Sequence, residues 1–385
     1  MKRPVPPHIA SVALRPALLL APIAALALAA CGQAGGSAEP PVSETALAAV
    51  SADPGAPRAP LARAVDALFT ADGIGETDAV IVMHRGEIAV ERYRKGYGPQ
   101  TRFLGWSMSK TVTALVIGML VSDGRLHLDE SPPISHWRRT GDPRGEITLK
   151  QLLQMRSGLR HTERTDPPYR AETARLLFLD GRDDMAAEAE AEPLEAEPGR
   201  KFEYSTATSI ILADIATRVL TQSEDPARRQ KAMAEFLSAR LFGPLGLHSM
   251  TDEYDAAGTM IGGAMISANA RDWAQLGEFL RHGGSVKGSQ ILPRGWIEFM
   301  RKPSPRAPDY GAHLWLNRPS GTDRNVLFAE QGPASAFAAI GHLGQYVIVS
   351  PAQRLTIVRL GKTREEERTA LVARLAEISA LYPAS

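Results

Sequence analysis

The 385-residue sequence is poor in cysteine and has almost no net charge. It holds one cysteine, so no disulfide can form within the chain. Its 44 Lys and Arg against 43 Asp and Glu leave a formal charge of +1, and no basic stripe with interleaved aromatic residues is present. Binding to nucleic acid usually needs such a positive surface. These shortages exclude a disulfide scaffold and predict no nucleic-acid partner.

Motifs of several common catalytic sites are missing too. The nine histidines show neither H-x-x-x-H nor a two-histidine, one-carboxylate spacing. The stretch HTERTD at residues 161–166 offers oxygen ligands, but a solvated loop is the simpler interpretation. No G-x-S-x-G is present, which excludes the nucleophile elbow of the α/β-hydrolases. The sequence therefore predicts no metal site and no other cofactor.

The first 31 residues have the pattern of a secretory leader. Basic residues open it, and residues 16–30 are apolar and end in small side chains. The only cysteine, Cys31, follows directly in LAACG, which resembles the bacterial lipoprotein signal whose cysteine is lipidated. An ordinary cleaved leader is the alternative. The resemblance implies a lipid anchor at the bacterial cell envelope, and Gly32 after the cysteine favours the periplasmic face of an outer membrane, if the host has one.

Composition separates this leader from a globular body. Residues 32–60 are rich in Ala, Pro, Gly and Ser without an apolar period, which predicts a flexible linker. The body is expected to span residues 61–385 as one domain. Short β-rich runs lie near both of its ends, and the middle, about 125–300, is mostly helical or irregular. The expected fold class is mixed α and β: a mainly antiparallel sheet built from both ends, flanked by helices, with a helical insertion.

The first catalytic signal lies in GWSMSKTVTALVIGML, residues 105–120, where we expect a buried helix from near Ser107. Ser107 and Lys110 form S-x-x-K, and residues at i and i+3 share one face of a helix. A serine nucleophile needs an adjacent base, and burial favours the neutral form of lysine. The serine N–H also points outward at a helix start, where an oxyanion could form. The pair is chemically competent, although the motif is short.

Two further elements accompany this pair. Tyr204 lies on a turn before a second apolar helix, in KFEYSTATSIILADIA. Gly341 and Gly344 interrupt an apolar strand, AAIGHLGQYVIVSP, and would let a substrate approach its backbone. The order Ser/Lys, then Tyr, then a glycine-containing strand is that of the serine β-lactamase and penicillin-binding protein superfamily.

The body resembles the class C β-lactamase-related serine hydrolases, and within them the branch of 6-aminohexanoate-dimer hydrolases and related esterases. The resemblance covers nearly all of residues 78–361. It implies a β-lactamase/transpeptidase-like fold with the active site between the sheet and the helical insertion. The stretches that carry it include GWSMSKTVTALVIGMLVSDGRLHLDE, ITLKQLLQMRSGL, GRKFEYST, LFGPLGL, ARDWAQLGEFLRHGG, ILPRGWIEFM and GQYVIVSP.

By position, the resemblance implies that Ser107 is the acylated nucleophile, Lys110 its proton partner and Tyr204 the proton shuttle. The N–H of Ser107 is implied as one donor to the oxyanion. Thr206 is a departure, because many relatives have there an Asn that helps to bind the substrate amide. Thr206 and Tyr169 are candidate substrate contacts.

The third motif, K-T-G or H-x-G in relatives, has two possible registers here. His342-Leu343-Gly344 fits H-x-G. Ala339-Ile340-Gly341 fits the position in the esterase and amide-hydrolase branch, and we prefer it. In that register Ile340 and Gly341 border the substrate, and the backbone N–H of His342 is the second oxyanion donor.

The resemblance implies a serine hydrolase that cleaves a small-molecule ester or linear amide through an acyl-enzyme. The absence of both the Asn and the motif lysine weakens the case for β-lactam recognition, but it leaves the Ser/Lys/Tyr chemistry intact. The alternatives are a D-alanyl-D-alanine carboxypeptidase or β-lactamase, and a penicillin-recognising protein that does not turn over. The sequence indicates no oligomeric state.

The lipoprotein signal predicts that the protein fractionates with membranes when it is expressed in a bacterium with its leader intact. The Cys31→Ser variant should move to the soluble fraction, because it has no thiol to receive the lipid. Detergent-free fractionation followed by immunoblotting measures this. A wild-type protein that is already soluble would contradict the prediction.

Overall fold

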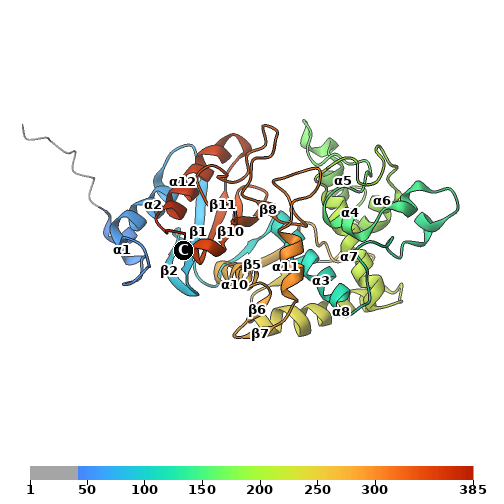
Figure 1. The fold of residues 1–385 in the computed structure, drawn as a ribbon, viewed down its shortest axis with the longest axis horizontal. Helices are drawn as coiled ribbons and strands as arrows, with labels where there is room; N and C mark the ends of the chain where they lie inside the picture. Colours follow the sequence, from blue (N-terminus) through green and yellow to red (C-terminus); the bar gives the residue numbers. More distant parts are fainter. Residues whose placement is uncertain (1–41, 385) are drawn as a thin grey trace, which may run out of the picture. The chain divides into compact units, whose positions relative to one another are not determined.

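An antiparallel sheet organises the described part of the chain, residues 42–384 of this computed structural model (Figure 1). Its six strands lie in the order β2-β1-β11-β10-β9-β8. The strands are β1 (Glu76–His84), β2 (Glu87–Tyr93), β8 (Trp315–Leu316), β9 (Phe337–Gly341), β10 (Gln345–Ser350) and β11 (Leu355–Lys362). Because β1 pairs with β11, the two ends of the domain meet at the middle of the sheet. The expected fold class is confirmed.

Alternate side chains of β1 enter two separate cores, as the period of a strand requires. Val80 and Val82 pack with α2 (Arg58–Thr70) and α12 (Arg368–Ala380). Ala79 and Ile81 pack on the other face, which α10 (Ala270–Arg281) covers. The sheet is therefore buried on both faces by helices.

A hairpin at Arg85-Gly86 joins β1 to β2, within one of the β-rich regions expected near the ends of the domain. Both residues have positive φ, 56° at Arg85 and 91° at Gly86. Two-residue turns of this handedness match the twist of antiparallel strands. The β-rich region expected near the other end of the domain forms β9, β10 and β11, and α12 follows as the last helix.

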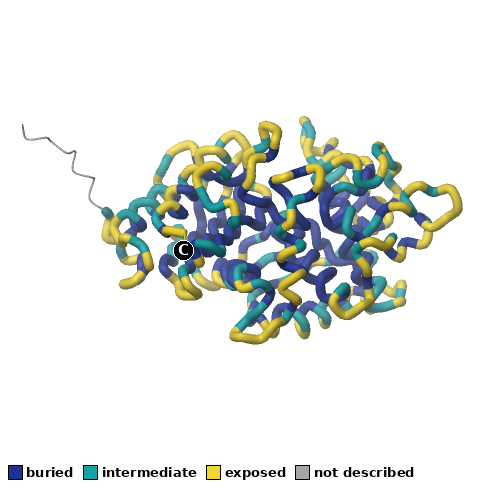
Figure 2. The backbone as a smooth tube through the Cα atoms, in the orientation of Figure 1, coloured by how far each residue is buried: buried dark blue, intermediate teal, exposed yellow. Residues whose placement is uncertain are grey.

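The helix α3 (Ser109–Ser122) runs through the middle of the domain, and residues 109–120 are all buried (Figure 2). It begins two residues later than expected, because the segment Trp106–Met108 forms a turn of 3-10 helix. In a 3-10 turn, residues i and i+3 again lie on the same side. Ser107 therefore still shares a face with Lys110.

The expected helical insertion lies between α3 and α10, and it also contains short strands. Its Thr148–Gln151 capping box starts one of the helices. A small sheet orders β3 (Arg102–Leu104), β5 (Ile266–Asn269) and β4 (Thr251–Asp252). The insertion's helices are α4 (Leu149–Leu153), α5 (Glu172–Phe178), α6 (Met185–Ala191), α7 (Thr206–Leu220), α8 (Pro226–Leu237) and α9 (Gly243–Leu245). After α10 follow β6 (Ser285–Val286), β7 (Ser289–Gln290) and α11 (Arg294–Met300).

The domain starts earlier than predicted, because residues 42–60 are not a flexible linker. They contain α1 (Glu44–Ala48), where Ser43 accepts a hydrogen bond from the N–H of Ala46. Val50 then forms a bridge to Val90 on the edge strand β2. A five-residue helix is too short to show an apolar period, so composition alone suggested a linker. The rest of that segment lies outside the described residues.

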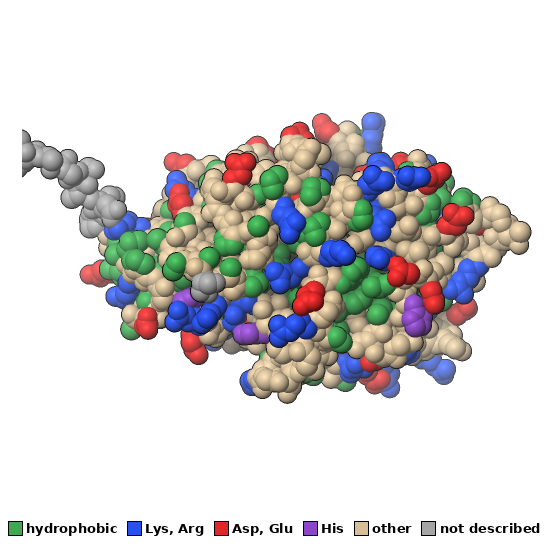
Figure 3. Space-filling model, in the orientation of Figure 1, with side chains coloured by type: hydrophobic (Ala, Val, Ile, Leu, Met, Phe, Trp, Pro, Cys, Tyr) green, Lys and Arg blue, Asp and Glu red, His purple; other side chains and the backbone are tan. Residues whose placement is uncertain are grey.

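The leader and Cys31 also lie outside the described residues. No helix within residues 42–384 has both the length and the apolar character needed to cross a membrane. On the face drawn in Figure 3, basic and acidic side chains are interspersed, in keeping with the formal charge of +1.

Candidate functional site

Lys110, on the first turn of α3, is a buried amine with three oxygen partners. Its residue exposure is 1%. The Nζ atom lies 3.0 Å from the Ser107 Oγ, 2.8 Å from the Thr206 Oγ1 and 2.8 Å from the carbonyl oxygen of Gly263. A buried ammonium or amine is costly unless its polar groups are paired. The surrounding oxygens satisfy that requirement and fix Nζ beside the Ser107 hydroxyl.

Ser107 lies in the 3-10 turn, directly after a strained residue. Trp106 has φ of 49°, a left-handed conformation that a bulky side chain seldom adopts. Strain of this kind collects at functional sites, where the surrounding structure enforces it. Ser107 itself is half-buried, whereas Met108 and Lys110 behind it are buried. Ser107 therefore remains partly exposed while its hydroxyl contacts the buried lysine.

Tyr204 stands on the turn before α7 and packs among aromatic rings. It stacks on Trp315 with 5.3 Å between centroids and contacts Tyr310 edge-on at 5.8 Å. The Lys110 Nζ lies 5.0 Å from the centroid of the Tyr204 ring. The Ser107 side chain is near enough to lower the pKa of the phenol, against the larger effect of burial. The structure thus brings Ser107, Lys110 and Tyr204 together, as the sequence analysis expected.

Thr206 occupies a different place from the one expected of a substrate contact. It is the first residue of α7, 2% exposed, after the cap residue Ser205. Its hydroxyl donates to the Glu163 Oε1 at 2.7 Å and accepts from Lys110. Its backbone N–H donates to the Glu163 Oε2 at 2.8 Å. The hydroxyl is committed inside the protein and is not free for a substrate.

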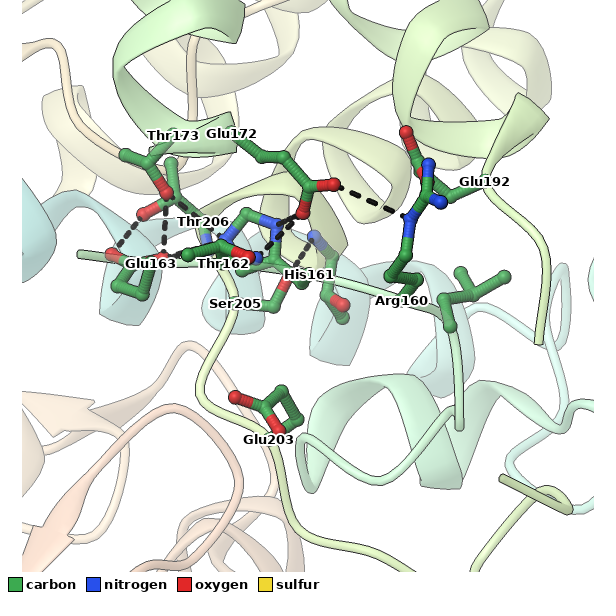
Figure 4. A network of polar contacts seen from close by, with 12 residues as sticks. Arg160, His161, Thr162, Glu163, Glu172, Thr173, Glu192, Glu203, Ser205 and Thr206 are labelled. Atoms are coloured by element: carbon green, nitrogen blue, oxygen red, sulfur yellow. Dashed lines mark hydrogen bonds and ion pairs between the residues drawn. The ribbon is translucent and has the colours of Figure 1, made fainter. Parts of the chain in front are cut away.

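Glu163 lies in the loop between α4 and α5 and links that loop to the start of α7 (Figure 4). Its Oε2 also lies 2.8 Å from the His161 Nε2 and accepts from the Thr173 hydroxyl at 2.9 Å. A carboxylate at a helix N-terminus is favoured by the helix dipole. The interpretation of HTERTD as a solvated loop was therefore wrong for two of its residues: the His161 side chain is 2% exposed and that of Glu163 21%.

The pKa values of Lys110, Tyr204 and Glu163 determine which of these groups can exchange a proton near neutral pH. Burial lowers the pKa of Lys110 to about 8, although the charge of Glu163 opposes this shift. Burial and the charge of Glu163 raise the pKa of Tyr204 well above its usual range. Burial would also raise the pKa of Glu163, but the hydrogen bond from His161 and the charge of Lys110 hold it at about 2. Near neutral pH, Lys110 can take up and release a proton, whereas Tyr204 stays neutral and Glu163 stays ionised.

The end of β9 lies against the nucleophile segment. A Cβ added at Gly341 would lie 2.2 Å from the backbone oxygen of Gly105, so only glycine fits at this contact. The next residue, His342, contacts the Trp106 ring with 5.2 Å between centroids. Leu343 and Gly344 belong to the turn that leads to β10. This geometry favours the register Ala339-Ile340-Gly341 and brings the backbone of His342 near the turn that holds Ser107.

Two other expected contacts fall outside this cluster. Ile340 is 9% exposed, and its side chain belongs to the core beneath α2 and α12. Tyr169 is 61% exposed on the turn Pro168–Arg170. Within residues 42–384, no group of three or more His, Cys, Asp and Glu side chains could hold a metal ion.

Sequence reasoning missed Glu163 and the carbonyl group of Gly263. Gly263 lies in GTMIGGAM, which the sequence identifies only as a loop. One signal for Glu163 was available. A threonine at position 206, in place of the relatives' asparagine, cannot supply the same set of donors and acceptors. Another polar group was therefore needed near the lysine.

Comparison with known proteins agrees with this geometry. The family described as Beta-lactamase matches residues 65–381. The 6-aminohexanoate-dimer hydrolase of Paenarthrobacter ureafaciens is 26% identical over 323 residues, which are 80% of this chain and 80% of that protein.

Solved structures share the fold. A Bacillus anthracis protein, provisionally described as a 6-aminohexanoate-dimer hydrolase, superposes with a TM-score of 0.64 at 23% identity, covering 80% of this chain and 79% of the other. A family VIII carboxylesterase gives 0.59 at 19% identity, covering 83% and 96%. With the family match extending over most of the chain, and with the serine, lysine and tyrosine side by side, this protein belongs to the Beta-lactamase family.

Proposed function

We propose that the protein is a serine hydrolase that cleaves an ester or a linear amide through an acyl-enzyme formed on Ser107. The observation that carries the proposal is the 3.0 Å contact between the Lys110 Nζ and the Ser107 Oγ. A neutral lysine in that place is a base for the hydroxyl, and a pKa of about 8 gives it a neutral fraction at physiological pH.

In the acylation step, the Ser107 Oγ attacks the carbonyl carbon of the substrate, and its proton passes to the Lys110 Nζ. The backbone N–H groups of Ser107 and His342 donate hydrogen bonds to the oxyanion. Donors that are already in place stabilise the negative charge that develops in the transition state. The bond to the leaving group then breaks. The leaving oxygen or nitrogen receives the proton from Lys110 through the Tyr204 hydroxyl.

Deacylation repeats these steps with water. A water molecule attacks the acyl carbon and gives its proton to the same pair of groups. The bond to the Ser107 Oγ breaks, and that oxygen recovers a proton. The high pKa of Tyr204 suits a group that passes protons while it remains neutral. Lys110 is the base in both half-reactions.

The preference for an ester or linear amide rests on the relatives and on the two departures from the β-lactam-binding pattern. One relative is named for hydrolysis of the 6-aminohexanoate dimer, and a structural neighbour is a carboxylesterase. Thr206 takes the place of the asparagine, and the Ala339-Ile340-Gly341 register contains no lysine. A site without this asparagine and this lysine has fewer hydrogen-bonding and charged groups to bind the carboxylate and amide of a β-lactam.

We also propose that a lipid on Cys31 holds this domain at the bacterial cell envelope. The support is the leader sequence alone, with its apolar stretch ending in LAACG. Anchoring of this kind would keep the hydrolase at the membrane surface while its catalytic domain works in the aqueous phase.

Hydrolysis assays on a panel of p-nitrophenyl esters, linear amides and a chromogenic cephalosporin test the proposal. We expect turnover of a short-chain ester or amide that exceeds turnover of the cephalosporin. General acid–base assistance contributes roughly 10²–10⁴-fold, so Lys110→Ala and Tyr204→Phe should each lower kcat by about that much. Ser107→Ala should abolish labelling by a fluorophosphonate probe.

Each alternative has its own signature in these assays. Faster hydrolysis of the cephalosporin or of a D-alanyl-D-alanine peptide would favour a β-lactamase or a peptidase. An acyl adduct that forms and never decays, followed by mass spectrometry, would favour a binding protein. Full labelling of Ser107→Ala would show that the nucleophile lies elsewhere.

The pKa of Lys110 predicts the pH dependence of acylation. Burial lowers this pKa to about 8, so the neutral base is scarce below pH 8 and predominates above it. The rate of fluorophosphonate labelling should rise about tenfold for each pH unit below 8 and level off above it. Pre-incubation at each pH controls for unfolding. A rate independent of pH between 6 and 9 would contradict the role of Lys110 as base.

His342 is expected to act through its backbone. The His342→Ala variant keeps the N–H group that would face the oxyanion, so most of the turnover should survive. The measured quantity is kcat on the best ester, with Lys110→Ala as the inactive reference. A loss of several orders of magnitude would instead assign a role to the imidazole.

A further inference from the structure

The hydrogen bonds of Thr206 leave it only one way to contact Lys110. A hydroxyl has one proton to donate and lone pairs to accept with. The Glu163 Oε1, 2.7 Å away, belongs to an ionised carboxylate that can only accept, so the Thr206 proton points to it. Towards Lys110, at 2.8 Å, the Thr206 oxygen is therefore an acceptor only.

Because the Thr206 oxygen can only accept, the directions of the N–H groups and the lone pair of a neutral Lys110 Nζ are fixed. A neutral amine has two N–H donors and one lone pair. The carbonyl oxygen of Gly263 accepts one N–H, and the Thr206 oxygen accepts the other. The third direction of Nζ points to the Ser107 Oγ, 3.0 Å away. The lone pair is left facing the proton that it must remove.

We propose that Glu163 is the positioning residue of this site: by holding the Thr206 proton, it aims the lone pair of neutral Lys110 at Ser107. The inference rests on the proposed function, because it assumes that Lys110 is the base. Glu163 touches neither Ser107 nor the reacting atoms and works through Thr206.

Glu163 has a second, electrostatic effect on the same lysine. The titratable groups around Lys110 are Glu163, Tyr204 and His313. Burial lowers the pKa of His313 to about 3, so it is neutral, and Tyr204 is neutral because its pKa is raised. Glu163 is then the charged neighbour that raises the pKa of Lys110 against desolvation.

The variant Glu163→Gln would reverse the orientation of the Thr206 hydroxyl. The Oε2 position receives hydrogen bonds from His161, Thr173 and the N–H of Thr206, so the glutamine oxygen must take that place. The amide NH₂ then occupies the Oε1 position and donates to the Thr206 oxygen. The Thr206 proton turns to the Lys110 Nζ and competes with Ser107 for the lone pair.

We expect Glu163→Gln to lower kcat on an ester substrate by roughly 10- to 100-fold. This loss is smaller than the loss of the general base itself, because Lys110 is still present. KM should change by less than about threefold. The acid limb of the rate profile should also move to lower pH, because the charge that raises the pKa of Lys110 is gone. Fluorophosphonate labelling as a function of pH gives the same two quantities without any substrate.

The pH profile distinguishes positioning from damage to the site. A loosened site would admit water, and the pKa of Lys110 would rise towards its value of 10.5 in water. The acid limb would then move to higher pH, opposite to the expected direction. Thermal unfolding and circular dichroism check that the variant is folded.

Thr206 provides an independent test through a double-mutant cycle. Thr206→Ser keeps the hydroxyl and should stay within about threefold of wild type, whereas Thr206→Val removes it and should lower kcat by at least about tenfold. If Glu163 works through Thr206, adding Glu163→Gln to Thr206→Val should change kcat little further. If Glu163→Gln does not fold, the comparison of Thr206→Ser with Thr206→Val still tests whether the Thr206 hydroxyl orients Lys110.

Glu172→Gln is the matched control. Glu172 belongs to the same network, where it accepts from the N–H of Thr162 at 2.6 Å and pairs with Arg160 at 3.4 Å, but it does not contact Thr206. Its variant should keep the wild-type kcat and pH profile. An equal loss in Glu172→Gln would mean that any disturbance of this loop lowers activity, and the proposal would be wrong.

Three other results would overturn the inference: a wild-type rate and profile in Glu163→Gln, an acid limb at higher pH, or effects of Glu163→Gln and Thr206→Val that multiply. Failure of the proposed function has a different signature, namely no hydrolysis by the wild type or full labelling of Ser107→Ala. The two outcomes are therefore separable.

Discussion

A primary amine buried at the mouth of an apolar helix is the constraint on which the site depends. The Lys110 Nζ needs oxygen partners, and the chain brings them from four separate places: the turn before α3, the start of α7, the Gly262-Gly263 loop and, through Thr206, the loop that carries Glu163. The lysine thus connects local helix geometry, tertiary packing and proton transfer.

The parts that depend on neighbouring residues were predictable from the sequence. The β1–β2 hairpin follows from Arg85-Gly86, and the buried helix α3 follows from an apolar segment with no polar face. Ser107 and Lys110 share a face because three residues separate them, whichever of the two helix types holds the serine. The sheet built from both termini followed from the placement of β-rich runs at the two ends of the domain.

The parts that depend on contacts through space were not predictable. Glu163 lies 43 positions from Thr206 in the chain, and Gly263 lies 153 from Lys110. No local pattern marks a loop glutamate as the partner of a helix start. The sequence left two registers of the third motif open, with Ala339-Ile340-Gly341 preferred, and the close approach of Gly341 to Gly105 favours the same register. Such contacts are set by the tertiary structure.

The pairing of β1 with β11 has a consequence for the order of events at the ribosome. In this ladder Thr77 pairs with Gly361, so strands from opposite ends of the domain must meet before the sheet can close. Long-range pairing of this kind is slow to form, and here it requires everything from β1 to β11 to have been synthesised. The central ladder of the sheet therefore cannot close in the nascent chain until β11 has left the ribosome, and until then the apolar side chains of β1 lack their partner strand.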